Sequence, residues 1–397
     1  MTSKPLTRNE LVELCKQRGI KGYSGKTKAE IQALVSEKQQ DAITPTTEKV
    51  CRLNYIGSKY QLIDWLTQNI LEQTGWTSFS DKSVSDLFAG TGVVSYHFRK
   101  SGARVVSNDA ELYSYIISHA FTRSVYTTVC RDCLIELQRE LVERRYTEAE
   151  DGFVTLNYSP QGAKERKFFT IDNARRIDYV RARIESLRQT VTDDEYKFLL
   201  ASLITSADAV SNVPAVYGCF LKNFKLKATR QLVLTPIHMN TDSPAEGSSS
   251  YHSDVLNPEF LRSFETDMVY LDPPYNERQY SKNYFPLNII AKTPEQLLSE
   301  EPLKGKTGIP TDCFISPFCK KGKVVETAFE TLCRDLRTKW IFLSYNSESI
   351  VSKKNMLDIM RKYGKVTVIE RDYKRFKSFE YNNDVDIKEY LFCLRKK

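Results

Sequence analysis

The sequence predicts an α/β protein built on an open, mostly parallel sheet, with a mostly helical insertion and a small helical hairpin ahead of it. Three observations support this fold class. Lys82 to Phe88 is predicted to form a strand that runs into a glycine-rich turn, and a second short strand leads to an acid at Asp109. The apolar run from Met268 to Leu271 ends in Asp-Pro-Pro-Tyr, and prolines cannot continue a central strand. Because such sheets bind ligands beyond the carboxyl ends of their strands, these motifs are expected at one edge.

Composition predicts a folded, soluble protein. The 397 residues are 41% hydrophobic, enough for a large α/β domain with smaller units. No apolar stretch reaches membrane-spanning length and no secretory signal core opens the chain, so an intracellular location without a membrane partner is expected. The nine cysteines are irregularly spaced and are expected to be reduced thiols. The pair Cys130 and Cys133 has no second pair or nearby histidine, so no metal site is expected.

Residues 1–38 are predicted to form a basic helical hairpin. They carry eight Lys or Arg against four Asp or Glu, a surplus of four within a net charge of +8. Thr7-Arg-Asn-Glu10 and Thr27-Lys-Ala-Glu30 are capping boxes, each followed by apolar residues at helical spacing. The segment from Leu6 to Val35 resembles the SAP motif, a small DNA-binding module, and three lysines of its loop and second helix start could reach phosphates: Lys21, Lys26 and Lys28. A solvated hairpin that docks a protein is the alternative.

Residues 39–50 are polar, contain Thr-Pro-Thr and are predicted to be a linker. After them, Asn54-Tyr-Ile-Gly-Ser-Lys59 leads into a helix. Asp86-Leu-Phe-Ala-Gly-Thr-Gly92 is a glycine-rich turn at the end of a strand, followed by an amphipathic helix from Val93 to Lys100. Backbone can approach a ligand closely at such a turn, although a generic α/β turn is the alternative. The turn lacks G-x-G-x-x-G, which disfavours a dinucleotide.

Three acids at predicted strand ends are candidates for binding a nucleoside cofactor derived from methionine. Asp86 could accept a hydrogen bond from an amino-acid ammonium. Asp109 follows it by 23 residues at the tip of the next strand, where an acid commonly holds ribose hydroxyls. Asp254 lies 18 residues before Asp272 and could accept a hydrogen bond from a purine amine.

The Asp272-Pro-Pro-Tyr275 corner suits chemistry on an exocyclic amine. The lone pair of such an amine is delocalised into its ring, which makes it a poor nucleophile. The carboxylate of Asp272 and the carbonyl of Pro273 could accept both amine hydrogens and localise the lone pair, while Tyr275 stacks on the ring and the prolines, including Pro274, fix the corner. An ordinary strand-ending turn is the alternative.

Residues 112–250 interrupt the strand and helix rhythm. Helices are predicted near 131–145, 171–190 and 193–209, and a Ser/Pro/Gly loop from Thr241 to Ser250 closes the segment. The run from Val213 to Arg230 contains no acid and interleaves aromatic residues with four basic ones: Lys222, Lys225, Lys227 and Arg230. That pattern is typical of a nucleic-acid surface, and a packed helix end with a solvated lysine face is equally compatible with it.

The remaining chain is predicted to complete the sheet. Another helix and strand are followed by a further helix and a final strand pair that could form an antiparallel hairpin at the sheet edge. The expected ranges are a helix near 324–338, a strand at 340–346, a helix at 350–362, and strands at 365–371 and 389–395.

Taken in order, these motifs resemble the D12, or alpha, class of adenine-specific DNA methyltransferases over about residues 52–395. The runs DPPYNERQYSKNYFPLN, GKTG and FLSYN are similar to one type II modification subfamily. The resemblance implies a Rossmann-like sheet that binds S-adenosyl-L-methionine, with the target adenine flipped out of double-stranded DNA. It also implies a methyltransferase domain at 51–397, with 112–250 as the target-recognition insertion.

The resemblance implies roles for individual residues. Asp109 would hold the cofactor's ribose and Asp254 its adenine, with Tyr55 and Lys59 nearby. The residues that would line the cofactor are Asp86, Phe88, Ala89, Gly90 and Gly92. The residues that would hold the target base are Asp272, Pro273, Pro274 and Tyr275.

Several alternatives stay open. Related enzymes methylate RNA bases or protein glutamine, and a DNA-binding scaffold without catalysis is a rival of another class. A short palindrome is the expected target, with CATG as the candidate, and a cognate restriction endonuclease could act separately. Typical members of the class lack the N-terminal hairpin, which leaves cytoplasm, nucleus and a viral replication site open as locations.

Overall fold

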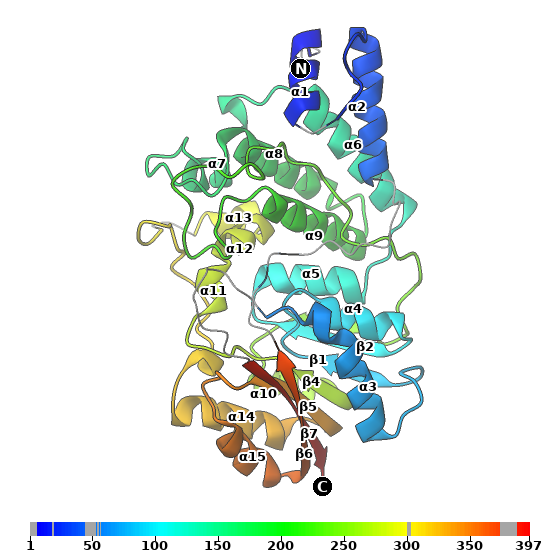
Figure 1. Ribbon diagram of the computed structural model, residues 1–397, viewed down its shortest axis with the longest axis vertical. Helices are drawn as coiled ribbons and strands as arrows, with labels where there is room; N and C mark the ends of the chain where they lie inside the picture. Colours follow the sequence, from blue (N-terminus) through cyan, green and yellow to red (C-terminus); the bar gives the residue numbers. More distant parts are fainter. Residues whose placement is uncertain are drawn as a thin grey trace. The chain divides into compact units, whose positions relative to one another are not determined.

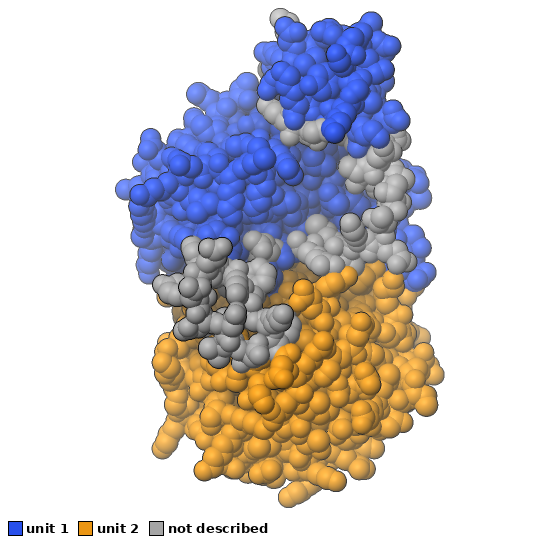
Figure 2. All heavy atoms as spheres, in the orientation of Figure 1, with its two compact units in different colours: residues 1–55, 124–242, 284–312 blue, residues 56–123, 243–283, 313–397 orange. Residues whose placement is uncertain are grey.

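A computed structural model of the chain describes residues 6–17, 20–43, 53, 55, 57–299, 303–373 and 387–397. The chain divides into two compact units, each built from segments that are distant in sequence (Figure 2). The sheet unit comprises residues 56–123, 243–283 and 313–397. The helical unit comprises residues 1–55, 124–242 and 284–312.

Seven strands form the sheet: β1 Ser83–Asp86, β2 Arg104–Asp109, β3 Ser249–His252, β4 Thr266–Leu271, β5 Thr338–Asn346, β6 Gly364–Tyr373 and β7 Ile387–Lys396. Their order is β3-β2-β1-β4-β5-β7-β6 (Figure 1). The first five are parallel neighbours, and β7 runs antiparallel to both β5 and β6. The predicted α/β class and final hairpin are confirmed, with β6 as the edge strand. The order reverses between β1 and β4, where an open sheet offers a crevice to a ligand.

Helices cover both faces of the sheet (Figure 1). They are η1 Lys59–Leu62, α3 Ile63–Thr74, α4 Val93–Lys100, α5 Leu112–Thr122, α10 Pro258–Arg262, α11 Tyr280–Asn283, η3 Pro317–Cys319, α14 Lys323–Asp335 and α15 Lys353–Arg361. Successive side chains of β4 alternate between two cores. Met268 and Tyr270 share one core with residues of α3 and α4, while Val269 and Leu271 share the other with residues of α10, α14 and α15. Burial on both faces explains why β4 is a continuous apolar run.

The described helices of the helical unit are α1 Arg8–Gln17, α2 Lys28–Ile43, α6 Thr128–Glu143, η2 Glu148–Glu150, α7 Phe153–Tyr158, α8 Ile171–Leu187, α9 Asp193–Ala209, α12 Phe285–Ala291 and α13 Pro294–Leu297. The three helices predicted inside the insertion correspond to α6, α8 and α9. Side-chain caps explain where these helices begin. Thr127, Thr170 and Thr192 each accept a hydrogen bond from a backbone amide of the first turn.

Two packed helices, α1 and α2, lie where the N-terminal hairpin was predicted, and its likeness to the SAP motif stays a prediction. The carboxylate of Glu10 accepts a hydrogen bond from the Thr7 amide at 2.7 Å, and Glu30 and Thr27 repeat this geometry at 2.7 Å. The hairpin packs on α6 through a small core, and Glu10 also pairs with Arg145. The buried residues of that core are Leu11, Leu14, Cys15, Ile31, Val35 and Val142. Helix α2 continues to Ile43, beyond the predicted boundary at residue 38 and into the predicted linker. Residues 44–50 lie outside the described part of the chain.

Two boundaries of the predicted insertion also differ. Helix α5 belongs to the sheet unit, where it lies against β2 and β3, so the helical segment begins at Ser124 rather than at residue 112. The expected closing loop ends early, since β3 begins at Ser249. Residues 284–312 belong to the helical unit, which no local pattern in the sequence indicated.

Residues 213–248 form turns and irregular backbone rather than a helix end. The alternative that the lysines of the basic run lie on a packed helix end is therefore wrong, because they lie on turns and irregular backbone. Among the described residues, no helix combines the length and the apolar character needed to cross a membrane.

Candidate functional site

The glycine-rich turn after β1 is closed by backbone hydrogen bonds. The Ala89 amide donates to the Asn108 carbonyl at 3.0 Å, and the Gly92 amide donates to the Ala89 carbonyl at 2.7 Å. Gly92 has φ of 70°, and a Cβ there would lie 2.7 Å from the Phe121 ring and 3.1 Å from Ser118 Cα. Only glycine therefore fits between this turn and α5.

Asp109 holds the same turn from the end of β2. Its Oδ2 accepts a hydrogen bond from the Gly90 amide at 2.8 Å, and its Oδ1 accepts one from the Glu111 amide at 2.9 Å. Ser114 donates to the Gly90 carbonyl at 2.6 Å. Each carboxylate oxygen has two lone pairs, so Asp109 keeps acceptor capacity for hydroxyl groups. Burial raises the pKa of Asp109, and the two amide hydrogen bonds oppose that shift.

Asp86 is buried at the end of β1, where Ser95 donates a hydrogen bond to its Oδ2 at 2.6 Å. Burial, opposed by the Ser95 hydrogen bond and assisted by the negative charges of Asp272 and Asp109, raises the pKa of Asp86 to about 7. Acids from the ends of β1, β2 and β4 therefore converge, as their strand positions predicted. Their mutual repulsion would be relieved by a cation.

Lys59 bridges two acids on this side of the sheet. Its Nζ lies 2.9 Å from Oδ1 of Asp272 and 3.3 Å from Oε1 of Glu389. Both the lysine and Glu389 are less than 5% exposed. Burial favours the neutral amine, but the charges of the two carboxylates outweigh it and raise the pKa of Lys59, so the ammonium form is held. The sequence placed Lys59 beside the cofactor, whereas the structure places it against Asp272.

Tyr275 faces this ion pair with its hydroxyl. The hydroxyl contacts both Asp272 Oδ1 and Lys59 Nζ, and it lies 3.5 Å from Oε1 of Glu389. The ring packs edge-on against Tyr345 at 5.6 Å between centroids. Lys59 and Tyr275 thus both contact the same carboxylate oxygen of Asp272, Oδ1. Pro273 is buried and Pro274 half-buried, which fixes the backbone of the corner.

Glu389 was missed by the sequence reasoning. It lies on β7 opposite Asn346 of β5, and Ser344 donates a hydrogen bond to its Oε1 at 3.0 Å. A signal was available, because Glu389 directly precedes the apolar run from Tyr390 to Leu394, and an acid on such a strand is seldom buried without a partner. Nothing in the local pattern named Lys59 as that partner, since the two residues are 330 positions apart.

The other predicted cofactor residues are dispersed. Asp254 is exposed after β3, and its Oδ1 accepts a hydrogen bond from the Leu256 amide at 3.0 Å. The Phe88 ring lies edge-on to Phe318 at 5.0 Å. Tyr55 belongs to the helical unit, where it stacks on Tyr284 at 4.8 Å, and its neighbours at positions 54 and 56 lie outside the described residues. The role predicted for each of these residues stays a prediction.

The predicted DNA-contacting lysines differ in exposure. Lys222 and Arg230 are exposed and Lys227 is half-buried, on the irregular segment of the helical unit. Lys225 is half-buried, and its ammonium contacts the Val213 carbonyl and lies 3.5 Å from the Pro214 carbonyl, so its DNA contact stays a prediction. On the N-terminal hairpin, Lys21 is exposed while Lys26 and Lys28 are half-buried.

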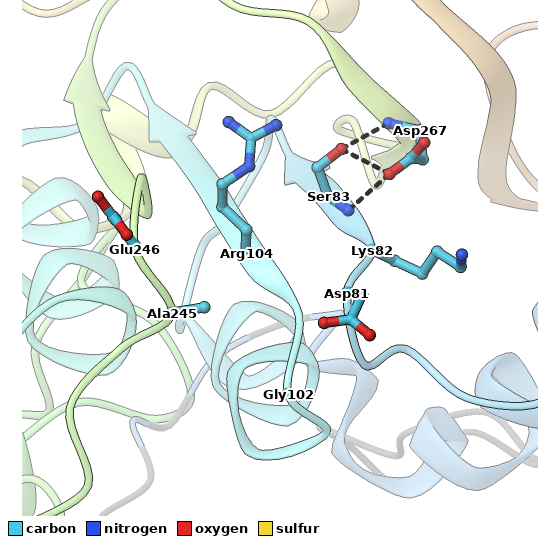
Figure 3. A pocket seen from close by; sticks show the side chains of 8 residues that line it. All are labelled: Asp81, Lys82, Ser83, Gly102, Arg104, Ala245, Glu246 and Asp267. Atoms are coloured by element: carbon cyan, nitrogen blue, oxygen red, sulfur yellow. Dashed lines mark hydrogen bonds between the residues drawn. The ribbon is translucent and has the colours of Figure 1, made fainter.

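A separate hollow of about 380 Å³ opens at the amino ends of β1 and β2 (Figure 3). Asp267 closes it on one side by accepting hydrogen bonds from the amide and hydroxyl of Ser83 at 2.8 and 2.7 Å. Lys82 and Arg104 line it together with acids, so its charges are mixed. The hollow lies at the opposite ends of the strands from the converging carboxylates. The hydrogen bonds between Asp267 and Ser83 join β4 to β1 there.

Comparisons with known proteins identify the family of the chain. A sequence model of the D12 class N6 adenine-specific DNA methyltransferases matches residues 55–359. Type II methyltransferase M.CviAII of Paramecium bursaria Chlorella virus 1 is 38% identical over 86% of this chain and 98% of its own length. Type II methyltransferase M.NlaIII of Neisseria lactamica is 37% identical over 83% of this chain and 94% of its own length.

More distant relatives show the same class. Type II methyltransferase M.FokI of Planomicrobium okeanokoites is 30% identical over 87% of this chain, which corresponds to 53% of that longer protein. The matched region contains the glycine turn, the three converging carboxylates and Lys59. The chain therefore belongs to the D12 class of N6 adenine-specific DNA methyltransferases.

Proposed function

We propose that the chain transfers a methyl group from S-adenosyl-L-methionine to N6 of an adenine flipped out of double-stranded DNA, at a short palindrome with CATG as the first candidate. The convergence of Asp86, Asp109 and Asp272, with Lys59 bridging Asp272 to Glu389, carries this proposal. These carboxylates lie at the strand ends that flank the topological switch point of the sheet. Residues 124–242 would recognise the target.

The residues at the strand ends fit a cationic nucleoside. Asp86 is buried and its pKa is raised to about 7, so an ammonium placed beside it would compensate its charge. Asp109 retains lone pairs for ribose hydroxyls beyond its two amide hydrogen bonds. Asp254 would accept from the adenine amine. Phe88, Ala89, Gly90 and Gly92 would line the cofactor, which supplies an electrophilic methyl group when bound.

Asp272 would act on the target amine. Lys59 and Tyr275 both contact its Oδ1, so they fix the carboxylate and direct Oδ2 to another partner. Positive charge develops on N6 as the new carbon–nitrogen bond forms, and a fixed carboxylate stabilises that charge more than it stabilises the ground state. The same carboxylate can accept the proton that N6 loses. Pro273 would contribute its carbonyl to the amine, and Tyr275 would border the base.

The partners follow from the same proposal. Double-stranded DNA is the substrate, with the N-terminal hairpin adding phosphate contacts through Lys21, Lys26 and Lys28. A cognate restriction endonuclease would act as a separate protein that cuts the same site when it is unmethylated. The relatives named type II methyltransferases support that expectation.

The test is methylation of plasmid DNA by the purified chain with S-adenosyl-L-methionine, followed by sequencing with detection of N6-methyladenine. We expect one short palindromic motif to be modified on both strands. Asp272→Ala should lower the single-turnover rate by at least about a hundredfold while the variant still folds and binds the cofactor, the scale of losing one fixed electrostatic partner. A wild-type chain that methylates RNA adenines but no duplex DNA would overturn the proposal.

A further inference from the structure

A buried asparagine fixes the basic loop of the helical unit from one end. The side chain of Asn173, at the start of α8, donates to the carbonyls of Ala228 and Arg230 at 3.1 and 2.8 Å. Its Oδ1 accepts a hydrogen bond from the Leu232 amide at 2.9 Å. The hydrogen bonds of this buried side-chain amide thus all go to irregular backbone. That backbone belongs to no helix or sheet, so the amide supplies partners for its polar groups.

A second buried asparagine fixes the other end of the loop. The side chain of Asn212 donates to the carbonyls of Lys167 and Leu221 at 3.0 and 3.2 Å and accepts from the Lys225 amide at 3.0 Å. Lys225 adds its ammonium to the Val213 carbonyl. Residues 221–232 are therefore held at both ends by fully buried amide groups, and the loop between them is preformed.

This clamped loop presents a leucine to solvent. Leu226 is 77% exposed, at the start of a turn closed by the Ala228 and Thr229 amides, which donate to the Lys225 carbonyl at 2.9 and 3.2 Å. Ala228 is fully buried and anchors the turn. Single exposed leucines are common on protein surfaces, so exposure alone carries no function. Here the leucine is at the tip of a turn that two buried asparagines hold rigid.

The surroundings of the leucine are basic. Lys222, Lys227 and Arg230 flank it on the same loop, and the segment from Val213 to Arg230 contains no acid. Lys167 donates to the Lys222 carbonyl at 3.0 Å, which brings a further lysine beside the loop.

A second exposed loop is joined to the same segment. The guanidinium of Arg166, the neighbour of Lys167 in sequence, donates to the Lys306 carbonyl at 3.0 Å. Lys304 and Lys306 of that loop are exposed. The adjacent residues Arg166 and Lys167 thus each hold one basic loop. Cationic side chains around an exposed apolar side chain fit a nucleic acid, whose phosphates are negatively charged and whose bases are flat and stacked.

We propose that Leu226 inserts into the DNA base stack at the methylation site and holds open the space that the flipped adenine leaves. Lys222, Lys227, Arg230, Lys304 and Lys306 contact the phosphates on either side. This inference rests on the proposed function, because a wedge is needed only if a base leaves a duplex. Apolar side chains inserted between base pairs are a known way to offset unstacking.

The experiment compares Leu226→Ala with Leu298→Ala, a matched control at a leucine that is 87% exposed outside the basic loops. The probe is a duplex carrying the motif found by methylation sequencing, with 2-aminopurine at the target position for fluorescence and adenine there for single-turnover rates. We expect Leu226→Ala to lose most of the fluorescence gain on binding and to methylate at least tenfold more slowly. Leu298→Ala and Leu226→Phe should behave like the wild type.

A second substrate separates a wedge from a loop that has merely been disturbed. When the target adenine faces an abasic position, its flipping no longer requires a base pair to open, so Leu226→Ala should methylate within about threefold of the wild type. A defect that this substrate does not rescue would overturn the wedge, as would normal fluorescence and rate in Leu226→Ala on the paired duplex. A wild-type chain inactive on every duplex would overturn the proposed function itself. The salt dependence of DNA affinity should be unchanged in Leu226→Ala and shallower in Lys227→Gln.

Discussion

The ammonium of Lys59 lies 2.9 Å from Oδ1 of Asp272, although the two residues are separated by more than two hundred positions in the chain. Lys59 also reaches Glu389 at 3.3 Å, so one buried cation is shared between the buried carboxylate of Glu389 and the partly buried carboxylate of Asp272. A pair of this kind is costly to break, because removing one partner leaves an uncompensated charge in a poorly solvated place. The stability of the site and its catalytic strength are therefore linked.

Lys59→Met should destabilise the chain by about 3–5 kcal/mol, because Asp272 and Glu389 would then repel each other without a cation between them. Urea unfolding measures this change. The double variant Lys59→Met with Glu389→Gln removes one of the two opposed charges and should recover part of the loss. A double variant no more stable than Lys59→Met would show that the repulsion is not the cause.

Glu389→Gln tests whether the shared lysine tunes Asp272. Glutamine keeps an acceptor for the Ser344 hydroxyl but removes one negative charge, so Lys59 would neutralise Asp272 more completely. A less negative Asp272 stabilises positive charge on N6 less well, and we expect the single-turnover rate to fall about tenfold with little change in DNA affinity. Ser344→Ala is the matched control, since it removes the hydrogen bond without removing a charge. An equal rate loss in both variants would assign the effect to geometry instead.

Asp86 should make cofactor binding depend on pH. Its pKa is about 7 in the free protein, and a cationic ammonium beside it favours the ionised form, so binding below pH 7 releases a proton. Affinity for S-adenosyl-L-methionine should rise by up to about tenfold per pH unit until the pH reaches that pKa, and then level off. Calorimetry in two buffers of different ionisation enthalpy counts the proton. A pH-independent affinity in Asp86→Asn is the expected control.

The same group sets a stability trend of known sign. The folded pKa of Asp86 is raised from its ordinary value of 3.8 to about 7, so the folded state binds the proton more tightly than the unfolded state does. The contribution of Asp86 to stability is therefore full below about pH 4 and is lost as pH rises to about 7. In the absence of cofactor, Asp86→Asn should stabilise the chain at pH 8 by up to about 4 kcal/mol. Equal stabilisation at pH 4 and pH 8 would contradict this assignment.

Asp109→Ala should weaken cofactor binding by about 1.5–3 kcal/mol, since it removes the charged acceptor proposed for the ribose. The structure adds a complication, because Asp109 also accepts hydrogen bonds from the Gly90 and Glu111 amides. Asp109→Asn keeps one amide acceptor and separates the two roles. Calorimetry that finds unchanged affinity in both variants would remove Asp109 from the site.

Deleting residues 1–38 should weaken DNA binding and flatten its salt dependence while the methylated motif stays the same. The deletion also uncovers Val142, which shares a core with the hairpin, and so costs some stability. Replacing Lys21, Lys26 and Lys28 by glutamine removes charge without exposing that core, and it should reproduce the change in salt dependence. A changed motif in either protein would show that the hairpin reads bases.

Much of the sheet could be predicted from local sequence. Helix α4 has the predicted bounds, and β1, β2 and β4 occur where short predicted strands end in a glycine-rich turn, an acid or prolines. The acids at strand ends could be grouped because parallel strands bring their carboxyl ends to one edge. Grouping these acids requires only that the strands be parallel, which the alternation of strands and helices in the sequence indicates.

What the sequence did not reveal depends on contacts across the chain. Glu389 comes from the one antiparallel interior strand, whose register beside β5 decides which of its side chains meets Lys59. Lys225 looked like its basic neighbours, yet carbonyls of Val213 and Pro214 bind its ammonium. Loop 221–232 has no periodicity to detect, because two asparagines from elsewhere replace a ladder of hydrogen bonds.

Strand β7 follows all the other strands along the chain, yet it lies between β5 and β6. During synthesis β5 and β6 have unpaired edges until residues 387–396 emerge. Unpaired strand edges are sites where incompletely folded chains aggregate. Glu389 arrives on the same strand, so until then Lys59 can pair with Asp272 alone. The same late pairing therefore completes both the sheet and the charged surroundings of Lys59.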